Sequence, residues 1–298
     1  MFHQEAIQAQ KKSIELDPFG RAPREYKRRD LVSEAKSETQ GGAAMFDLRG
    51  KVAVVLGGTT GLGRALSVGL AAAGANVVAT GRRMEPLEET AAAIEALGRR
   101  TLRQAADVGD RASLIALRDR VVRELGPVDI LVNCAGRIRR VPTLEIEESE
   151  WNSIVDTNLT GTLRGCQVFA PQMLERGAGR IINIASLNSF VSFHEVASYA
   201  ASKAGVAALT RSLAVEWSRR GVLVNAIAPG VFRTALNQQL LDSTPRGQEL
   251  LMRTPQGRFG KVEELVGAAV FLASDASSYV TGVVLPVDGG FLASGVNQ

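Results

Sequence analysis

The sequence predicts an α/β protein built on one doubly wound, parallel, seven-stranded sheet with helices on both faces. Two patterns support this fold class: short apolar runs alternate with long amphipathic stretches, and the turns between them are short. The runs are almost continuously apolar, as strands covered on both faces are. The expected strands are residues 52–56, 76–80, 101–105, 129–132, 180–184, 222–227 and 283–287. The expected helices are residues 62–74, 84–97, 110–125, 151–176, 197–219 and 261–272.

The first 44 residues differ in composition from the remainder of the 298-residue chain. They are polar, contain Pro18 and Pro23, and carry eight Lys or Arg residues against seven Asp or Glu. So many acidic residues argue against a transit peptide, and no apolar segment suited to secretion is present. We expect residues 1–44 to form an arm that is flexible or docks on a neighbouring subunit, unless translation starts at Met45. Residues 45–298 are expected to form one domain.

Composition and charge exclude several classes of function. The net charge of +4 comes from scattered basic residues interleaved with acids, so no nucleic-acid surface is expected. His3 and His194 are the only histidines, which leaves nothing for a histidine-rich metal site. No apolar run approaches the roughly 18 residues of a membrane span. Cys134 and Cys166 lack CxxC spacing and are interpreted as reduced thiols, which favours a cytoplasmic protein.

A glycine-rich turn, residues 57–63, follows the first expected strand and precedes a helix. Its glycines allow a tight turn and bring a helix N-terminus, with its free N–H groups, close to an anion. At the start of a βαβ series the turn predicts binding of a dinucleotide pyrophosphate, although a plain strand-to-helix turn is the alternative. The residues expected to contact the pyrophosphate side of the cofactor are Gly57, Thr59, Thr60, Gly61, Leu62 and Gly63.

The end of the second expected strand bears on which dinucleotide binds. A carboxylate there accepts the ribose hydroxyls of NAD, whereas a cation meets the 2′-phosphate of NADP. This end reads Thr80-Gly81-Arg82-Arg83 and holds no acid. The sequence therefore predicts a preference for NADP(H), with Arg82 as the phosphate contact and NAD(H) as a second cofactor. The alternative is that both arginines begin a solvated helix.

Ser186, Tyr199 and Lys203 form the candidate proton-transfer group. Tyr199 and Lys203 share one helix face at the i and i+4 spacing, so the ammonium can lie a few ångströms from the phenol. An adjacent cation favours phenolate, and we expect it to lower the tyrosine pKa from about 10 toward the working pH. Ser186 ends the fifth expected strand, where its hydroxyl can reach the crevice and hold a substrate oxygen. A tyrosine packed on a helix beside a solvated lysine is the alternative.

These motifs occur together in an order and spacing that resemble the classical short-chain dehydrogenase/reductase family. The resemblance runs from about Phe46 to Leu292. Its motifs are the glycine turn, Asn133-Cys134-Ala135-Gly136, Asn158, Ser186, Tyr199-Ala200-Ala201-Ser202-Lys203 and Pro229-Gly230. It implies a Rossmann fold and an NAD(P)-dependent oxidoreductase.

The sequence departs from the family pattern in two places. Leu56 replaces the usual threonine that opens the turn, and Cys134 replaces the usual second asparagine. Both changes concern local hydrogen bonding and neither touches the reacting atoms, so we expect activity to survive.

The resemblance also implies roles for individual residues. Asn158 would position a water in a proton relay, Ser186 would orient the carbonyl, and Tyr199 would act as acid or base. Lys203 would in addition bind the nicotinamide ribose. The further residues expected to contact the cofactor are Asp107, Val108, Asn133, Ala135, Gly136, Tyr199, Lys203, Pro229, Gly230 and Thr234. A homotetramer, and a lid over the substrate at residues 232–254, follow from the same resemblance.

A basic stretch, residues 137–142, follows the Asn-Cys-Ala-Gly motif on a loop beside the crevice. It is similar to a stretch in the gluconate 5-dehydrogenases and 2-deoxy-gluconate 3-dehydrogenases of that family. An arginine fork matches a carboxylate, so Arg139 or Arg140 could hold a sugar acid while its keto group faces Tyr199. A solvated loop is the alternative.

The sequence therefore predicts reversible hydride transfer between NADP(H) and a keto or hydroxyl group of a small polyhydroxylated acid such as 5-ketogluconate. A 3-oxoacyl-carrier-protein reductase is the runner-up, since it shares nearly every core motif. A non-catalytic dinucleotide-sensing regulator is the alternative from another class.

Overall fold

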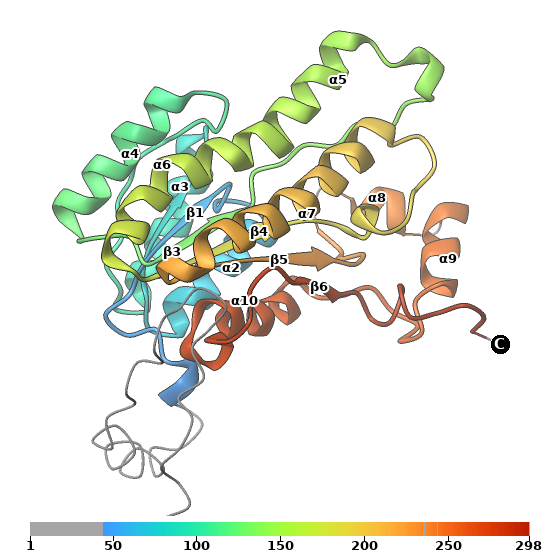
Figure 1. Cartoon of the computed structure of the whole chain (residues 1–298). Coiled ribbons are helices and arrows are strands. Elements are labelled where there is room, and N and C mark those ends of the chain that lie inside the picture. Colours follow the sequence, from blue (N-terminus) through green and yellow to red (C-terminus); the bar gives the residue numbers. More distant parts are fainter. Residues whose placement is uncertain (1–43, 235–236, 243, 298) are drawn as a thin grey trace, which may run out of the picture. The chain divides into compact units, whose positions relative to one another are not determined.

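Six parallel strands form the sheet in the part of the chain that the structure describes, in the spatial order β2-β1-β3-β4-β5-β6 (Figure 1). The structure is a computed structural model that describes residues 44–234, 237–242 and 244–297. The arm expected at residues 1–44 therefore lies outside the described residues, apart from Ala44. The strands are β1 Val52–Leu56, β2 Asn76–Thr80, β3 Ile130–Asn133, β4 Gly179–Ile184, β5 Val222–Pro229 and β6 Val284–Val287. Strand order reverses between β1 and β3, and a ligand crevice lies at the carboxyl ends of strands at such a point.

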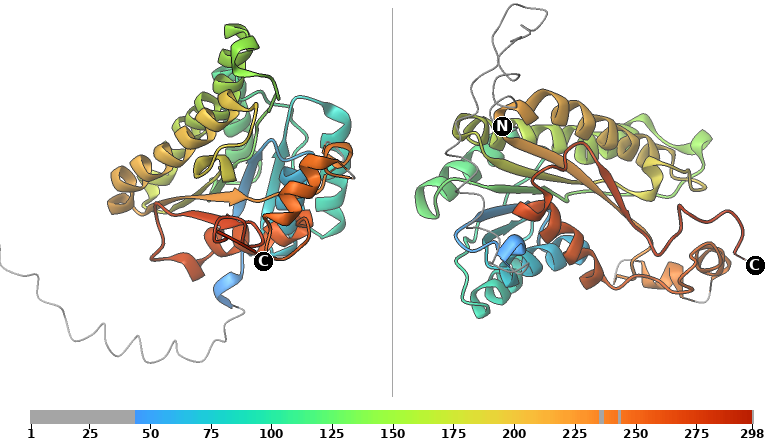
Figure 2. Two further views of the ribbon diagram at one scale, coloured as in Figure 1. Left: turned by 90° about the vertical axis from the view of Figure 1, so that its right-hand side faces the viewer. Right: turned by 60° about the horizontal axis from the view of Figure 1, so that its bottom comes forward.

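Helices cover both faces of the sheet (Figure 1, Figure 2). One face is covered by α2 (Gly61–Ala72), α3 (Met84–Ala96) and α10 (Val266–Ala273), the other by α4 (Arg111–Glu124), α6 (Gly161–Arg176) and α7 (Ala197–Trp217). Successive residues of β1 point to opposite layers. Val54 belongs to the core under α6, whereas Val55 belongs to the core under α2. Both strand faces are therefore buried, which explains why the strands are apolar throughout.

Local sequence sets several helix ends. α4 begins after Asp110, whose carboxylate accepts a hydrogen bond of 2.9 Å from the Ala112 N–H. α6 ends at Gly177, which adopts the left-handed conformation with φ of 69°. The smaller α-helices are α5 (Glu148–Val155), α8 (Gln238–Leu241) and α9 (Pro245–Met252). No helix within the described residues combines the length and the apolar character needed to span a membrane.

The prediction of a strand at residues 101–105 is wrong, so the sheet has six strands rather than seven within the described residues. The segment runs beside β2 and bonds to it near its two ends, where Arg100 O accepts a hydrogen bond from β2 and Ala106 N–H donates to the residue after β2. Between these points the Thr80 hydroxyl donates to Gln104 O at 2.7 Å. A side chain thus takes a position that a strand ladder would give to a backbone N–H.

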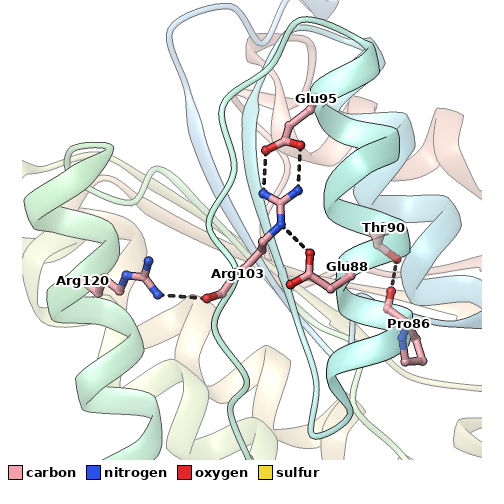
Figure 3. A network of polar contacts seen from close by, with 6 residues as sticks. All are labelled: Pro86, Glu88, Thr90, Glu95, Arg103 and Arg120. Atoms are coloured by element: carbon pink, nitrogen blue, oxygen red, sulfur yellow. Dashed lines mark hydrogen bonds and ion pairs between the residues drawn. The ribbon is translucent and has the colours of Figure 1, made fainter.

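Arg103 fixes the path of this extended segment by side-chain contacts (Figure 3). Its guanidinium pairs with Glu95 at 2.6 Å and with Glu88 at 2.5 Å, both on α3. Its main-chain oxygen accepts a hydrogen bond of 2.9 Å from Arg120 of α4. The ion pairs are partly exposed, so they contribute little to stability but hold the segment between the two helices. The segment leads directly to Asp107, at the crevice.

The helix expected at residues 151–176 is interrupted. α5 and α6 are joined by a π-helical turn, Asp156–Thr160, which contains Asn158. Turns of this kind are rare and occur frequently at functional sites. The turn buries Asn158 completely. Likewise, the helix expected at residues 261–272 consists of a 3₁₀ turn, Val262–Leu265, followed by α10.

Candidate active site

The turn between β1 and α2 has a backbone that only glycine can supply at two of its positions. Gly57 has φ of 77°, and a Cβ there would lie 2.5 Å from Ala135 N. A Cβ on Gly63 would lie 2.0 Å from Gly57 O. The first turn of α2 has no acidic residue, and Thr60 makes no side-chain cap. Its free N–H groups and the positive end of the helix dipole therefore suit an anion, and the turn fits a dinucleotide pyrophosphate.

One cavity of about 1150 Å³ extends from this turn along the carboxyl ends of the strands. Most of the site residues predicted from the sequence line it. They are Gly57, Thr59, Thr60, Gly61, Leu62, Gly63, Arg82, Asp107, Val108, Ala135, Gly136, Ser186, Tyr199, Lys203, Pro229, Gly230 and Thr234. Arg82 is exposed at the end of β2, and in the described residues its guanidinium has no ion pair.

Tyr199, Lys203 and Ser186 converge in this cavity from α7 and the end of β4. The Lys203 Nζ lies 5.8 Å from the centroid of the Tyr199 ring, so the two side chains share one helix face as predicted. The ammonium donates a hydrogen bond of 2.6 Å to Ile184 O, and only 5 % of Lys203 is exposed. The Ser186 hydroxyl accepts a hydrogen bond of 3.2 Å from the Asn188 N–H. The group therefore combines a buried amine, a phenol and a hydroxyl.

The predicted direction of the tyrosine pKa shift is wrong for this structure. Burial raises the pKa of Tyr199, and the hydrogen bond with Ser186 opposes that shift without overcoming it. Burial also lowers the pKa of Lys203 to about 8. Both shifts have the same physical cause, because removing water penalises the charged form of either group. Desolvation thus raises the pKa of Tyr199, whereas the i, i+4 spacing with Lys203 suggested that it would be lowered.

Asn158 lies behind the cavity rather than among its lining residues. Its side-chain oxygen accepts a hydrogen bond of 2.8 Å from the Arg137 N–H, and its amide donates to Arg137 O at 2.9 Å and to the Ser202 hydroxyl at 3.0 Å. A Cβ on Gly136 would lie 3.4 Å from the Asn158 Oδ1 and 3.7 Å from the Lys203 Nζ. Asn158 therefore holds the loop after β3 against α7, directly beside the catalytic candidates.

Asn133, predicted to contact the cofactor, does not line the cavity. Its side chain points toward Cys166 of α6 and Asn183 of β4. The amide donates to the Asn183 Oδ1 at 2.8 Å and to the Cys166 sulfur at 3.4 Å. The Asn183 amide in turn donates to the Thr210 hydroxyl at 2.9 Å. This polar chain connects β3, β4, α6 and α7 beneath the cavity, so the Asn133 side chain braces the sheet.

Arg139 and Arg140, the predicted substrate residues, do not line the cavity. Arg140 pairs with Glu195 at 2.5 Å, and Arg139 lies 3.5 Å from Glu150. The charge of Arg140 is thus matched by an acid of the protein itself, whereas Arg139 shares Glu150 with Arg137. Arg137 of the same basic stretch does line the cavity, together with its apolar neighbour Ile138.

Sequence reasoning missed several residues of the cavity wall. Phe193, Asn237, Leu241, Arg246 and Leu250 come from the loop after β4 and from the region of α8 and α9. Asn237 accepts a hydrogen bond of 2.7 Å from the Thr234 N–H. The sequence predicts a lid at residues 232–254, but nothing in the pattern of that segment marks which of its side chains face inward.

A dinucleotide-binding turn and a proton-transfer group in one cavity define a nicotinamide-dependent oxidoreductase. Comparison with known proteins agrees, since the family model described as short chain dehydrogenase matches residues 51–244. The chain therefore belongs to the short-chain dehydrogenase family and is an NAD(P)-dependent oxidoreductase. The resemblance indicated by the sequence motifs is confirmed.

Individual relatives match almost over their whole length. The chain is 46 % identical over 249 residues to the 2-dehydro-3-deoxy-D-gluconate 5-dehydrogenase of Dickeya dadantii (strain 3937), which covers 83 % of this chain and 98 % of the relative. It is 41 % identical over 250 residues to the gluconate 5-dehydrogenase of Gluconobacter oxydans (strain 621H), covering 84 % and 98 %. The crystal structure of a gluconate 5-dehydrogenase from Burkholderia cenocepacia J2315 in complex with NADP and tartrate superposes with a TM-score of 0.82. That structure is 39 % identical and covers 86 % of this chain and 100 % of its own.

Proposed function

We propose that the protein transfers hydride reversibly between NADP(H) and a keto or hydroxyl group of a small polyhydroxylated acid such as 5-ketogluconate. The observation that carries the proposal is the meeting of Ser186, Tyr199 and Lys203 in the cavity that begins at the glycine turn. Sugar-acid dehydrogenases among the relatives support the substrate class, and the relative in complex with NADP supports the cofactor.

The residues of the cavity would divide the chemistry among them. When bound, the nicotinamide cofactor supplies or accepts the hydride at the substrate carbon. Ser186 would hold the substrate oxygen, and Tyr199 would donate a proton to it in reduction and accept one in oxidation. Lys203 would hold the nicotinamide ribose, and Asn158 would position the loop at Gly136 and a water of the proton relay.

An assay of NADPH oxidation with 5-ketogluconate and related keto acids tests the substrate class. We expect turnover with the keto acids and none with acyl thioesters. Clear reduction of thioesters without turnover of keto acids would instead support the 3-oxoacyl-carrier-protein reductase. Any turnover that depends on Tyr199 would exclude the dinucleotide-sensing regulator.

Replacement of Arg82 by alanine tests the cofactor preference. We expect kcat/KM for NADPH to fall by about 10- to 100-fold, the range for losing a charge-assisted hydrogen bond, and kcat/KM for NADH to change by less than about threefold, because NADH has no 2′-phosphate. Arg83→Ala is the matched comparison, since Arg83 lines the cavity beside it. A parent enzyme that prefers NADH, or a larger effect at Arg83, would contradict the assignment.

We also propose a homotetramer in the cytoplasm, with residues 1–44 as an arm and residues 232–254 as a lid over the substrate. The apolar strand β6, which lies at the edge of the sheet and is only partly buried, supports a subunit interface. Two free cysteines, Cys134 and Cys166, support a reducing compartment. Light scattering of the purified protein tests the oligomer.

A further inference from the structure

Five cationic side chains line the cavity: Arg82, Arg83, Arg137, Lys203 and Arg246. All but Arg246 have an evident task or partner. Arg82 and Arg83 follow β2, at the end proposed for the 2′-phosphate, and Lys203 donates to a main-chain oxygen. Arg137 donates to Glu150 at 2.8 Å, so its charge is matched by a carboxylate. Arg246 is left as the cation of the wall with no such task.

Arg246 has no carboxylate within ion-pair distance among residues 44–234, 237–242 and 244–297. Both terminal nitrogens of its guanidinium are directed at one main-chain oxygen, His194 O, at 3.4 Å each. These contacts are long for N–H donors, so most of the hydrogen-bonding capacity of the fork is unused. An arginine fork with an unmatched charge inside a cavity suits a ligand carboxylate.

The position of Arg246 in its helix points the same way. α9 begins at Pro245, which places Arg246 in the first turn, and that turn contains no acidic residue. A cation near a helix N-terminus is unfavourable because the dipole and the free N–H groups there are positive. An anion bound by Arg246 would offset both the side-chain charge and the helix dipole.

The oxygen that meets Arg246 is positioned by an unusual backbone. Glu195, the next residue, has φ of 65° and is the only non-glycine residue with positive φ in the described part of the chain. It is held by Arg140, whose guanidinium pairs with its carboxylate at 2.5 Å, and by the Val141 N–H, which donates to its main-chain oxygen at 2.9 Å. Strained residues of this kind occur at ligand clamps. Arg140 thus acts through Glu195 on the loop that contacts Arg246.

We infer that Arg246, on the lid helix α9, binds the carboxylate of the substrate and gives the enzyme its preference for sugar acids over neutral polyols. This inference rests on the proposed function and assigns its carboxylate contact to a residue of the lid instead of Arg139 or Arg140. The bound acid would also lie beside Leu241 and Leu250, which line the cavity in the same region.

Arg246→Gln tests the inference. We expect the KM for a sugar acid such as gluconate to rise by about 10- to 100-fold, the range for a hydrogen bond to a charged group, with the KM for NADP⁺ within about threefold of the parent. In calorimetry of the protein saturated with NADP⁺, binding of tartrate should weaken by a similar factor. Binding of threitol, which replaces both carboxylates of that skeleton by hydroxymethyl groups, should not weaken. Arg246→Lys should fall between parent and Arg246→Gln.

Arg253→Gln is the matched control. Arg253 follows the last residue of α9, lies 3.6 Å from Glu249 and is absent from the cavity wall, so its loss should change neither constant. An unchanged affinity for tartrate and gluconate in Arg246→Gln would overturn the inference, as would equal loss for acid and NADP⁺. A parent that binds no tartrate would also overturn it. A parent that binds tartrate through Arg246 but turns over no sugar acid would overturn the proposed function alone.

Discussion

Replacing Tyr199 with phenylalanine is expected to lower kcat for keto-acid reduction by about 10²- to 10⁴-fold, the contribution typical of a positioned acid or base. The change removes one hydroxyl and leaves the half-buried ring in place beside Lys203. Cofactor binding should therefore survive, with a dissociation constant for NADPH within about threefold of the parent. Stopped-flow kinetics and fluorescence titration measure the two quantities separately.

The raised pKa of Tyr199 gives the pH dependence a definite sign. A phenol is protonated at neutral pH and burial raises the pKa of Tyr199 further, so Tyr199 is ready to donate a proton in reduction. Oxidation requires the phenol to give up its proton first, so kcat/KM for oxidation should rise with pH through the alkaline range. Ser186→Ala should move that rise to higher pH, since the hydrogen bond with Ser186 lowers the pKa.

Tyr279→Phe is the control for Tyr199→Phe, because Tyr279 is fully exposed. It should leave both kcat and its pH profile unchanged. A Tyr199→Phe variant with the kcat of the parent would contradict the assignment of Tyr199 as acid or base. Joint loss of kcat and NADPH binding would indicate that Tyr199 acts through the structure of the cavity instead.

The parts of the site that sequence predicts well depend on local geometry. The glycine turn is encoded in seven consecutive residues, and the close approach of Gly63 to Gly57 lies within the turn itself. The i, i+4 spacing of Tyr199 and Lys203 needs only a helix to bring both side chains to one face. The strands also follow directly from their apolar runs, except at residues 101–105.

The parts that sequence misses depend on distant partners. At residues 101–105, side chains from β2 and α3 fix an extended segment that a pattern of residue types cannot distinguish from a strand. Arg139 and Arg140 lie against Glu150 and Glu195 rather than in the cavity, and Arg140 and Glu195 are 55 residues apart along the chain. The direction of the Tyr199 pKa shift depends on burial, which no spacing of residues reveals.

Replacing Lys203 with methionine is expected to reduce kcat/KM by about 10²- to 10³-fold, the loss typical of one preorganised hydrogen-bond donor. The same change should alter how stability depends on pH. Burial lowers the pKa of Lys203 from 10.5 to about 8. Below pH 8 the amine is charged in both the folded and the unfolded protein, and the folded protein bears the full desolvation cost of that charge.

Between pH 8 and 10.5 the unfolded chain binds the proton and the folded protein does not, so this cost disappears as pH rises. The shift of about 2.5 units corresponds to about 3 kcal/mol. The free energy of unfolding of the parent should therefore increase relative to Lys203→Met by up to about that amount between pH 7 and pH 10.5.

Denaturant unfolding of both proteins at several pH values measures the difference and cancels the other titrating groups. Lys51→Met, at an exposed position, is the control. A difference between parent and Lys203→Met that stays constant over this range would show that the buried amine is not destabilised by its surroundings.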